Sequence, residues 1–218
     1  SGMTTIVKKR QKGDKSEVRK RILDKASGAF KVHGIKSVHM DDLAVSLEIS
    51  KRTIYELFHD KEQLLLEDVM RHREEMHVYV EGIASRAEHV LEVIIAIYRR
   101  EAEDFKTINP QFFKDMKKYP AVLDKLRDSR KEVDSEAVSY LQKGVEQGIF
   151  RADIDFNIIY RVMATQMDIV INSELSDEFP MIDIYDAVIF LHLRGITTER
   201  GQRIVDNFFL ELKEKRKL

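Results

Sequence analysis

The sequence predicts an all-α protein, and three observations lead to this class. Apolar residues recur at helical spacing along most of the chain, no segment shows the apolar–polar alternation of a strand, and only 3 prolines and 9 glycines interrupt the 218 residues. With 43% apolar residues, the chain can bury a substantial core. We expect an N-terminal domain of three helices over residues 1–60 and a C-terminal helical bundle over residues 61–218.

The first expected helix follows a basic tail. Residues 3–13 carry clustered Lys and Arg without an apolar period, so residues 1–13 are expected to be disordered. Asp14 and Glu17 can cap the helix that follows, and Gly34 ends it. Two short helices are then expected over residues 41–47 and 51–58.

The remaining helices are placed by caps and apolar stripes. Asp60 and Gln63 form a capping signal for a long helix that reaches residue 84. Asn109 and Pro110 start a short helix, and Gly148 is expected to end the long helix that begins at Pro120. Further helices are expected over residues 86–106, 156–174, 181–194 and 198–215.

Residues 34–66 have the spacing of a helix-turn-helix. Leu43, Ala44 and Leu47 form one apolar stripe, and Ile54 and Leu57 point back from the second helix. Ala44 lies where the two helices cross, and its small side chain lets their axes approach closely. The second helix then exposes a polar and basic face that fits a DNA major groove: Lys51, Arg52, Thr53, Tyr55 and Glu56.

The charge distribution agrees with a nucleic-acid partner for this segment. The formal net charge is only −1, but residues 1–62 hold 14 Lys/Arg and 9 Asp/Glu, a net charge of +5. Residues 63–218 hold the other 23 and 29, a net charge of −6. Charge alone is compatible with an ordinary solvated surface, but here the excess coincides with the helix-turn-helix.

Residues 17–64 resemble the DNA-binding domain of the TetR family of transcriptional regulators. The residues that carry the resemblance are Phe30, Gly34, Asp42, Leu43, Ala44, Ile49, Ser50, Thr53, Ile54, Tyr55, Phe58, Lys61 and Leu64. The resemblance implies binding of double-stranded DNA by this segment, and a C-terminal domain that binds a small-molecule effector and forms a homodimer through its last helices.

Two positions depart from the family pattern. Glu48 stands where members have glycine, and a positive φ there would cost on the order of 1 kcal/mol. His39 stands where members have a threonine or serine cap, so Asp41 and Asp42 are expected to supply most of the favourable charge at this helix N-terminus.

Candidate DNA contacts come from the motif and from the resemblance. Arg52 can bind guanine bidentately, and Thr53 can reach a base edge. The resemblance implies phosphate contacts for Tyr55 and Lys61, the latter at the N-terminus of the long helix. The full candidate set is Ser37, His39, Ser50, Lys51, Arg52, Thr53, Tyr55, His59 and Lys61.

The C-terminal candidates are large, adaptable side chains that core packing explains equally well. Candidates for an effector pocket are Met76, Tyr79, Tyr98, Phe112, Phe113, Met116, Tyr140, Met163 and Met167. Candidates for a dimer interface are Ile159, Tyr185, Val188, Ile189, His192, Val205, Phe208, Phe209 and Leu212.

Several functional classes are disfavoured. The chain has no cysteine, which excludes disulfides and thiolate sites and fits a cytoplasmic protein. No histidine spacing suits a metal, and no apolar run reaches the roughly 18 residues of a membrane span. No glycine-rich phosphate loop or catalytic constellation occurs, so we expect no cofactor and no enzymatic activity.

These observations predict a ligand-responsive, homodimeric transcriptional regulator. We expect it to act as a repressor that binds a pseudo-palindromic operator and is released by a small apolar effector. The alternative is a helical binding module or enzyme with a vestigial helix-turn-helix.

Overall fold

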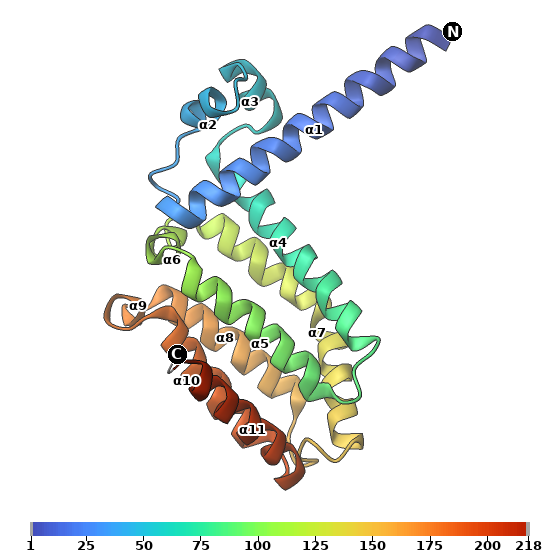
Figure 1. The fold of residues 1–218 in the computed structure, drawn as a ribbon, viewed down its shortest axis with the longest axis vertical. Coiled ribbons are helices and arrows are strands. Elements are labelled where there is room, and N and C mark those ends of the chain that lie inside the picture. The colour runs from blue at the N-terminus through green and yellow to red at the C-terminus, as the bar shows by residue number, and fades with distance from the viewer. Residues whose placement is uncertain (1, 217–218) are drawn as a thin grey trace. The chain divides into compact units, whose positions relative to one another are not determined.

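The computed structural model describes residues 2–216, with the side chains in that range except those of 2–13, 131–134, 167 and 216. The described residues fold into helices, as expected (Figure 1). They are α1 (Gly2–His33), α2 (Met40–Ser46), α3 (Lys51–Leu57), α4 (Lys61–Ala84), α5 (Val90–Thr107), α6 (Pro110–Met116), α7 (Pro120–Glu146), α8 (Phe156–Asn172), α9 (Leu175–Glu178), α10 (Met181–Ile196) and α11 (Glu199–Arg216).

Two helix starts differ from the expectation by more than two residues, and one short helix was not expected. Helix α1 begins at Gly2, so the backbone of residues 2–13 is helical and not disordered. Its Lys, Arg and Gln residues have good helix propensity, which the apolar period does not register. Helix α5 begins at Val90 rather than residue 86, and the single turn α9 is too short to show a period.

The chain divides into two compact units, and the division does not follow chain order. The first unit contains residues 1–74 together with 111–123. The second unit contains residues 75–110 and 124–218. Helix α6 therefore belongs almost wholly to the first unit, although the sequence led us to place it in the C-terminal domain. The functional division at residue 60 stays a prediction.

The first unit is built around the expected helix-turn-helix. Its core includes Phe30 of α1, Ala44 of α2, Ile54 of α3 and Leu64 of α4, all buried. Glu48, in the turn between α2 and α3, has φ 55°, as its glycine-like position predicted.

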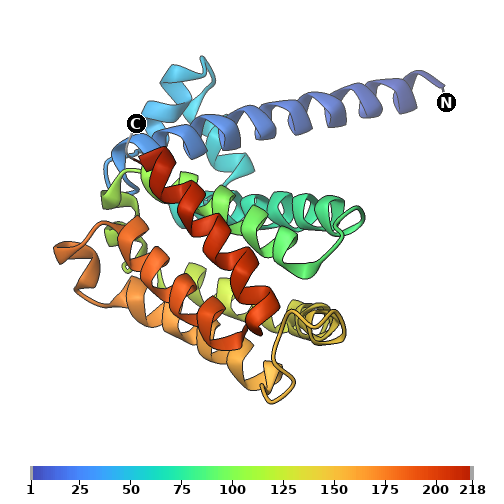
Figure 2. The same ribbon diagram turned by 60° about the horizontal axis from the view of Figure 1, so that its bottom comes forward.

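The second unit has a separate core. In it α5, α10 and α11 pack against one another (Figures 1 and 2), and aromatic side chains fill the centre. Gly148 ends the turn after α7 with φ 70°, as expected of a C-cap glycine. Phe150 and Thr197 then pair in an isolated antiparallel bridge that joins the segment after α7 to the end of α10.

Among the described residues, none of the helices has the length and apolar character that a membrane span requires.

Candidate nucleic-acid interface

Helix α3 has a well-formed N-terminus. Ser50 is its N-cap, and the Ser50 hydroxyl accepts a hydrogen bond from the Thr53 backbone N–H at 3.0 Å. Such a cap stabilises a helix by about 1 kcal/mol. The Thr53 hydroxyl lies 2.8 Å from the Ser50 hydroxyl, so both side chains are engaged with the helix end.

Burial fixes which face of α3 is exposed. Ile54 is fully buried and Leu57 is half-buried against the core of the first unit. The 3.6-residue period places Lys51, Arg52 and Tyr55 on sides of α3 other than that of Ile54, and all three side chains are exposed to solvent. The exposed face is therefore the polar and basic one that the sequence predicted.

An arginine of α1 holds the C-terminal end of α3. The Arg19 guanidinium donates to the Leu57 carbonyl at 2.7 Å and lies 4.3 Å from the centre of the Phe58 ring. The same guanidinium pairs with Glu67 of α4. Arg19 thus ties α1, α3 and α4 together. Sequence reasoning missed it, because its partners lie 38 and 48 residues away.

The two cations of the exposed face have acidic partners. Lys51 Nζ lies 2.8 Å from the Asp41 carboxylate of α2, and Arg52 Nε donates to Glu56 at 2.8 Å. Hydrogen bonding to Asp41 raises the pKa of Lys51, and hydrogen bonding to Glu56 raises the pKa of Arg52. Exposed pairs of this kind are weak, so a phosphate or a base edge can replace the carboxylate at small cost.

Tyr55 also contacts α2. Its hydroxyl lies 3.5 Å from the Asp41 carboxylate, and the side chain is 46% exposed. Asp41 therefore faces both Lys51 and Tyr55 across the helix-turn-helix. Asp41 was not among the candidates, although its place in the first turn of α2 pointed to an electrostatic role.

The nine DNA-binding candidates divide by exposure. Thr53 and Lys61 are half-buried, and the other seven are exposed: Ser37, His39, Ser50, Lys51, Arg52, Tyr55 and His59. His39 is the N-cap of α2 but makes no capping hydrogen bond, which agrees with its departure from the family pattern.

Lys61 is turned toward the protein. Its ammonium donates to the carbonyls of Ile35 and Val38 at 3.0 and 2.9 Å. The N-terminus of α4 is capped by Asp60, which accepts from the Gln63 N–H at 2.8 Å, as the capping signal predicted. In this conformation both Lys61 and the Gln63 N–H are hydrogen-bonded within the chain.

Comparison with known proteins agrees with this geometry. Residues 22–67 match the sequence model of the family described as "Bacterial regulatory proteins, tetR family". The HTH-type transcriptional repressor KstR2 of Mycolicibacterium smegmatis (strain ATCC 700084 / mc(2)155) is 27% identical over 148 residues, which are 66% of this chain and 72% of that protein. Residues 22–67 are therefore similar to the DNA-binding domain of TetR-family regulators, and the chain as a whole is similar to one curated repressor.

Solved structures of transcriptional regulators share the fold of this chain. KstR2 of Mycobacterium tuberculosis is 20% identical with a TM-score of 0.53, covering 83% of this chain and 95% of that one. A putative transcriptional regulator from Saccharomonospora viridis in complex with choline is 20% identical with a TM-score of 0.64, covering 84% and 100%. CprB from S. coelicolor A3(2) is 17% identical with a TM-score of 0.64, covering 92% and 98%.

The effector candidates divide between the two units. Phe112, Phe113 and Met116 belong to the first unit, where Phe112 and Met116 pack against its core. The described candidates of the second unit are Met76, Tyr79, Tyr98, Tyr140 and Met163. Tyr98 is fully buried and stacks on Tyr185 with ring centres 5.6 Å apart. The Met167 side chain lies outside the described residues.

A polar network crosses the aromatic core of the second unit. The Tyr98 hydroxyl donates to the buried Asp186 carboxylate at 2.6 Å, and the Tyr185 hydroxyl donates to Glu101. Burial and the nearby Glu101 carboxylate raise the pKa of Tyr185 far above its usual range. Tyr185 therefore stays protonated and acts as a donor. The network was missed because Asp186 and Glu101 are ordinary charged positions in the sequence.

Most of the dimer candidates fill the core of the second unit. Tyr185, Val188, Val205, Phe208 and Phe209 are buried within the chain itself. The other four, which are Ile159, Ile189, His192 and Leu212, are half-buried. The apolar residues of α10 and α11 are covered largely by packing within the chain.

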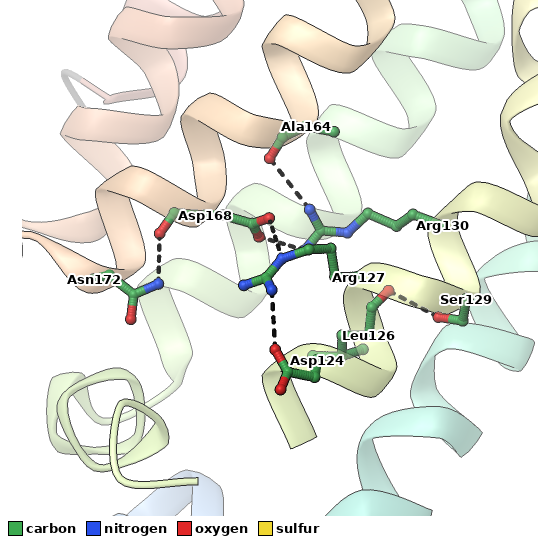
Figure 3. A network of polar contacts seen from close by, with 8 residues as sticks. All are labelled: Asp124, Leu126, Arg127, Ser129, Arg130, Ala164, Asp168 and Asn172. Atoms are coloured by element: carbon green, nitrogen blue, oxygen red, sulfur yellow. Dashed lines mark hydrogen bonds and ion pairs between the residues drawn. The ribbon is translucent and has the colours of Figure 1, made fainter. Parts of the chain in front are cut away.

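An ion-pair network sets the rotation of α8. Arg130 of α7 lies 2.9 Å from Asp168 and donates to the Ala164 carbonyl at 3.2 Å (Figure 3). Arg127 reaches the same carboxylate at 3.5 Å and pairs with Asp124 at 2.9 Å. The face of α8 that carries Ala164 and Asp168 is thus directed to α7.

A different face of α8 is left exposed. Ile158, Val162 and Ile169 follow one another at helical spacing and are 59%, 47% and 62% exposed. They border a shallow groove that is lined by Asn157, Ile158, Arg161, Val162, Thr165, Gln166 and Ile169. Leu191 of α10 is 69% exposed.

Proposed function

We propose that this protein is a ligand-responsive homodimeric repressor that binds a pseudo-palindromic operator and is released by a small, mostly apolar effector. The observation that carries the proposal is the exposed polar face of α3, which the buried Ile54 and the Ser50 cap hold in a defined orientation. A helix presented in this way can enter a major groove.

Arg52 and Lys51 have different roles in the proposed complex. Arg52 exchanges Glu56 for the O6 and N7 acceptors of a guanine, while Lys51 exchanges Asp41 for a phosphate. Tyr55 contacts the backbone beside Lys51. Phosphate contacts orient the protein without reading sequence, so only Arg52 in this set changes base preference.

A dimer supplies the second recognition helix. Two copies of α3 separated by about one turn of duplex, roughly 34–36 Å, match the halves of a palindrome. The exposed stripe of α8 supports the dimer, because the core candidates are already covered within one chain. Ile158, Val162, Ile169 and Leu191 are available to a second copy, whereas monomers seldom leave such rows uncovered.

The effector site is proposed in the second unit. Its half-buried Tyr79, Tyr140, Met76 and Met163 are adaptable side chains of the type that line apolar pockets. Effector binding would favour a state in which the two recognition helices no longer match one turn of duplex. Thermal-shift measurements with choline, which the Saccharomonospora viridis relative holds, and with a ketosteroid, the class in the printed description of KstR2 of Mycobacterium tuberculosis, give a first panel.

Selection from a random duplex pool tests DNA binding directly. We expect enrichment of a palindromic site whose affinity falls steeply with salt. Lys51→Ala and Tyr55→Ala should each weaken binding by about 1–3 kcal/mol, and Arg52→Ala should also relax preference at one base pair. Arg203→Ala on the exposed surface of α11 is the matched control. A pool that enriches no sequence would refute the proposal.

A further inference from the structure

The segment between α1 and α2 is an irregular turn that carries two candidate DNA contacts. Residues 34–39 include Ser37 and His39, both exposed, and lead directly into α2. The turn begins at Gly34, whose φ of 79° is favourable only for glycine. Such a segment has few hydrogen bonds of its own, so its position depends on groups from elsewhere in the fold.

Asp115 of α6 holds the N–H side of this turn. Its carboxylate is fully buried and accepts a hydrogen bond from the Lys36 backbone N–H at 2.8 Å. The Gln111 side chain of the same helix donates to the other carboxylate oxygen at 2.8 Å. A Cβ at Gly34 would lie 2.9 Å from Gln111 Cγ and 3.0 Å from the carboxylate, so the missing side chain permits the approach of α6.

Lys61 of α4 holds the carbonyl side of the same turn. Its ammonium donates to the carbonyls of Ile35 at 3.0 Å and Val38 at 2.9 Å, and it lies 3.4 Å from that of Lys36. An anionic acceptor and a cationic donor therefore bind opposite polar groups of one short peptide segment. Charge-assisted hydrogen bonds of this kind are stronger than neutral ones.

The protonation states agree with this arrangement. Burial alone would raise the pKa of Asp115, but hydrogen bonds from Lys36, Gln111 and Ile35 outweigh it and hold the pKa below its usual value. Burial lowers the pKa of Lys61, and the Asp115 charge acts against that change. Asp115 is thus ionised at neutral pH, as a strong acceptor must be.

We infer that Asp115 and Lys61 form a clamp that fixes residues 35–38 in the conformation needed for operator binding, with both side chains acting as positioning residues rather than DNA contacts. The inference rests on the proposed DNA-binding function. It assigns to α6, a helix outside the helix-turn-helix, a direct part in shaping the DNA-binding surface. It also gives Lys61 a role other than the phosphate contact that the family resemblance implies.

The first experiment measures the turn without DNA. In Asp115→Ala, amide hydrogen exchange at Lys36 should become faster, because the acceptor of that N–H is gone. Asp153→Asn, at an exposed carboxylate paired with Arg151, is the control and should leave Lys36 exchange unchanged. Unchanged exchange at Lys36 in Asp115→Ala would overturn the clamp. This result is independent of whether the protein binds any operator.

The second experiment measures operator affinity on a duplex selected with the wild type. Asp115→Ala should bind the duplex at least about tenfold more weakly, because residues 35–38 lose one of their anchors. The fraction of protein able to bind, measured by titration, should equal that of the wild type, because the variant remains folded. Asp115→Asn/Gln111→Glu exchanges donor and acceptor between the two side chains and should recover most of the affinity. If the alanine variant does not fold, Asp115→Leu, which keeps most of the side-chain volume and has no acceptor, is measured in its place.

The outcomes separate the clamp from the proposed function. Wild-type protein that selects no duplex contradicts DNA binding and leaves the exchange test standing. The positioning role of Asp115 is overturned if the wild type binds and Asp115→Ala binds equally well. It is also overturned if the double variant does not recover affinity.

Salt dependence distinguishes the two roles of Lys61. Lys61→Met should weaken operator binding while the slope of log affinity against log salt stays as in the wild type. A phosphate contact would instead reduce the slope by about 0.9 for each Lys61 that is lost. A reduced slope would therefore overturn the Lys61 half of the clamp. Lys51→Met, at the proposed phosphate contact, is the matched comparison and should reduce the slope.

Discussion

At the scale of single residues, Glu48 stores strain in the turn of the helix-turn-helix. Its φ of 55° lies in the left-handed region, where a side chain costs on the order of 1 kcal/mol. Glu48→Gly should relieve this cost, although the greater freedom of glycine in the unfolded chain offsets part of it. We expect a net gain of about 0.5 kcal/mol in chemical denaturation. Glu48→Ala, which keeps Cβ, should show no comparable gain.

Asp68 on α4 gives the first unit a measurable pH dependence. Its side chain is buried, and burial raises its pKa despite hydrogen bonds from Ser27 and Arg71. A carboxyl with a raised folded pKa favours the folded state when protonated, so stability falls as pH rises from about 4, the unfolded value, through the raised pKa.

Asp68→Asn should remove this fall. The variant should gain stability relative to the wild type between about pH 4 and neutrality, because its amide does not titrate. Urea denaturation at a series of pH values measures the difference. A difference between variant and wild type that stays constant over this range would contradict the assignment.

At the scale of elements, the exposed stripe of α8 is the expected contact for a second copy. Ile169→Asp places a charge on a side chain that is 62% exposed in the single chain, so the monomer fold should persist. Light scattering should give twice the chain mass of 25.5 kDa for the wild type and a value shifted toward 25.5 kDa for the variant. Val78→Asp, at an exposed position of α4, is the control and should remain dimeric.

Local elements could be predicted from the sequence, whereas contacts between distant residues could not. The helix-turn-helix and the positive φ of Glu48 follow from local patterns, and the structure contains both. The contact of Asp115 with Lys36 joins residues 79 positions apart, and no periodicity encodes such a pair. The sequence also could not assign Tyr185 and Phe208 to the core or to a dimer interface, because an apolar stripe has the same pattern whether its own chain or a second copy covers it.

At the scale of the whole molecule, the first unit is assembled from two separate parts of the chain. Residues 111–123 complete a core that otherwise consists of residues 1–74. Met116 and Val122 from this segment are buried there, and Asp115 holds the turn before α2. The helices that precede and follow the segment, α5 and α7, lie largely in the second unit. The segment is therefore joined through the chain to the second unit at both of its ends.

This assembly makes the N-terminal segment dependent on the rest of the chain. Removing a buried methionine side chain costs about 2–5 kcal/mol, and a fragment of residues 1–74 would lose Met116, Val122 and the Asp115 clamp together. Domains of this size have total stabilities of roughly 5–15 kcal/mol, so the loss is comparable with the whole. We expect the 1–74 fragment to show a broad, low-temperature melt by circular dichroism and little operator binding. Met116→Ala in the full chain should be destabilised but still fold. A fragment that melts cooperatively near the temperature of the full chain would show that residues 111–123 are dispensable.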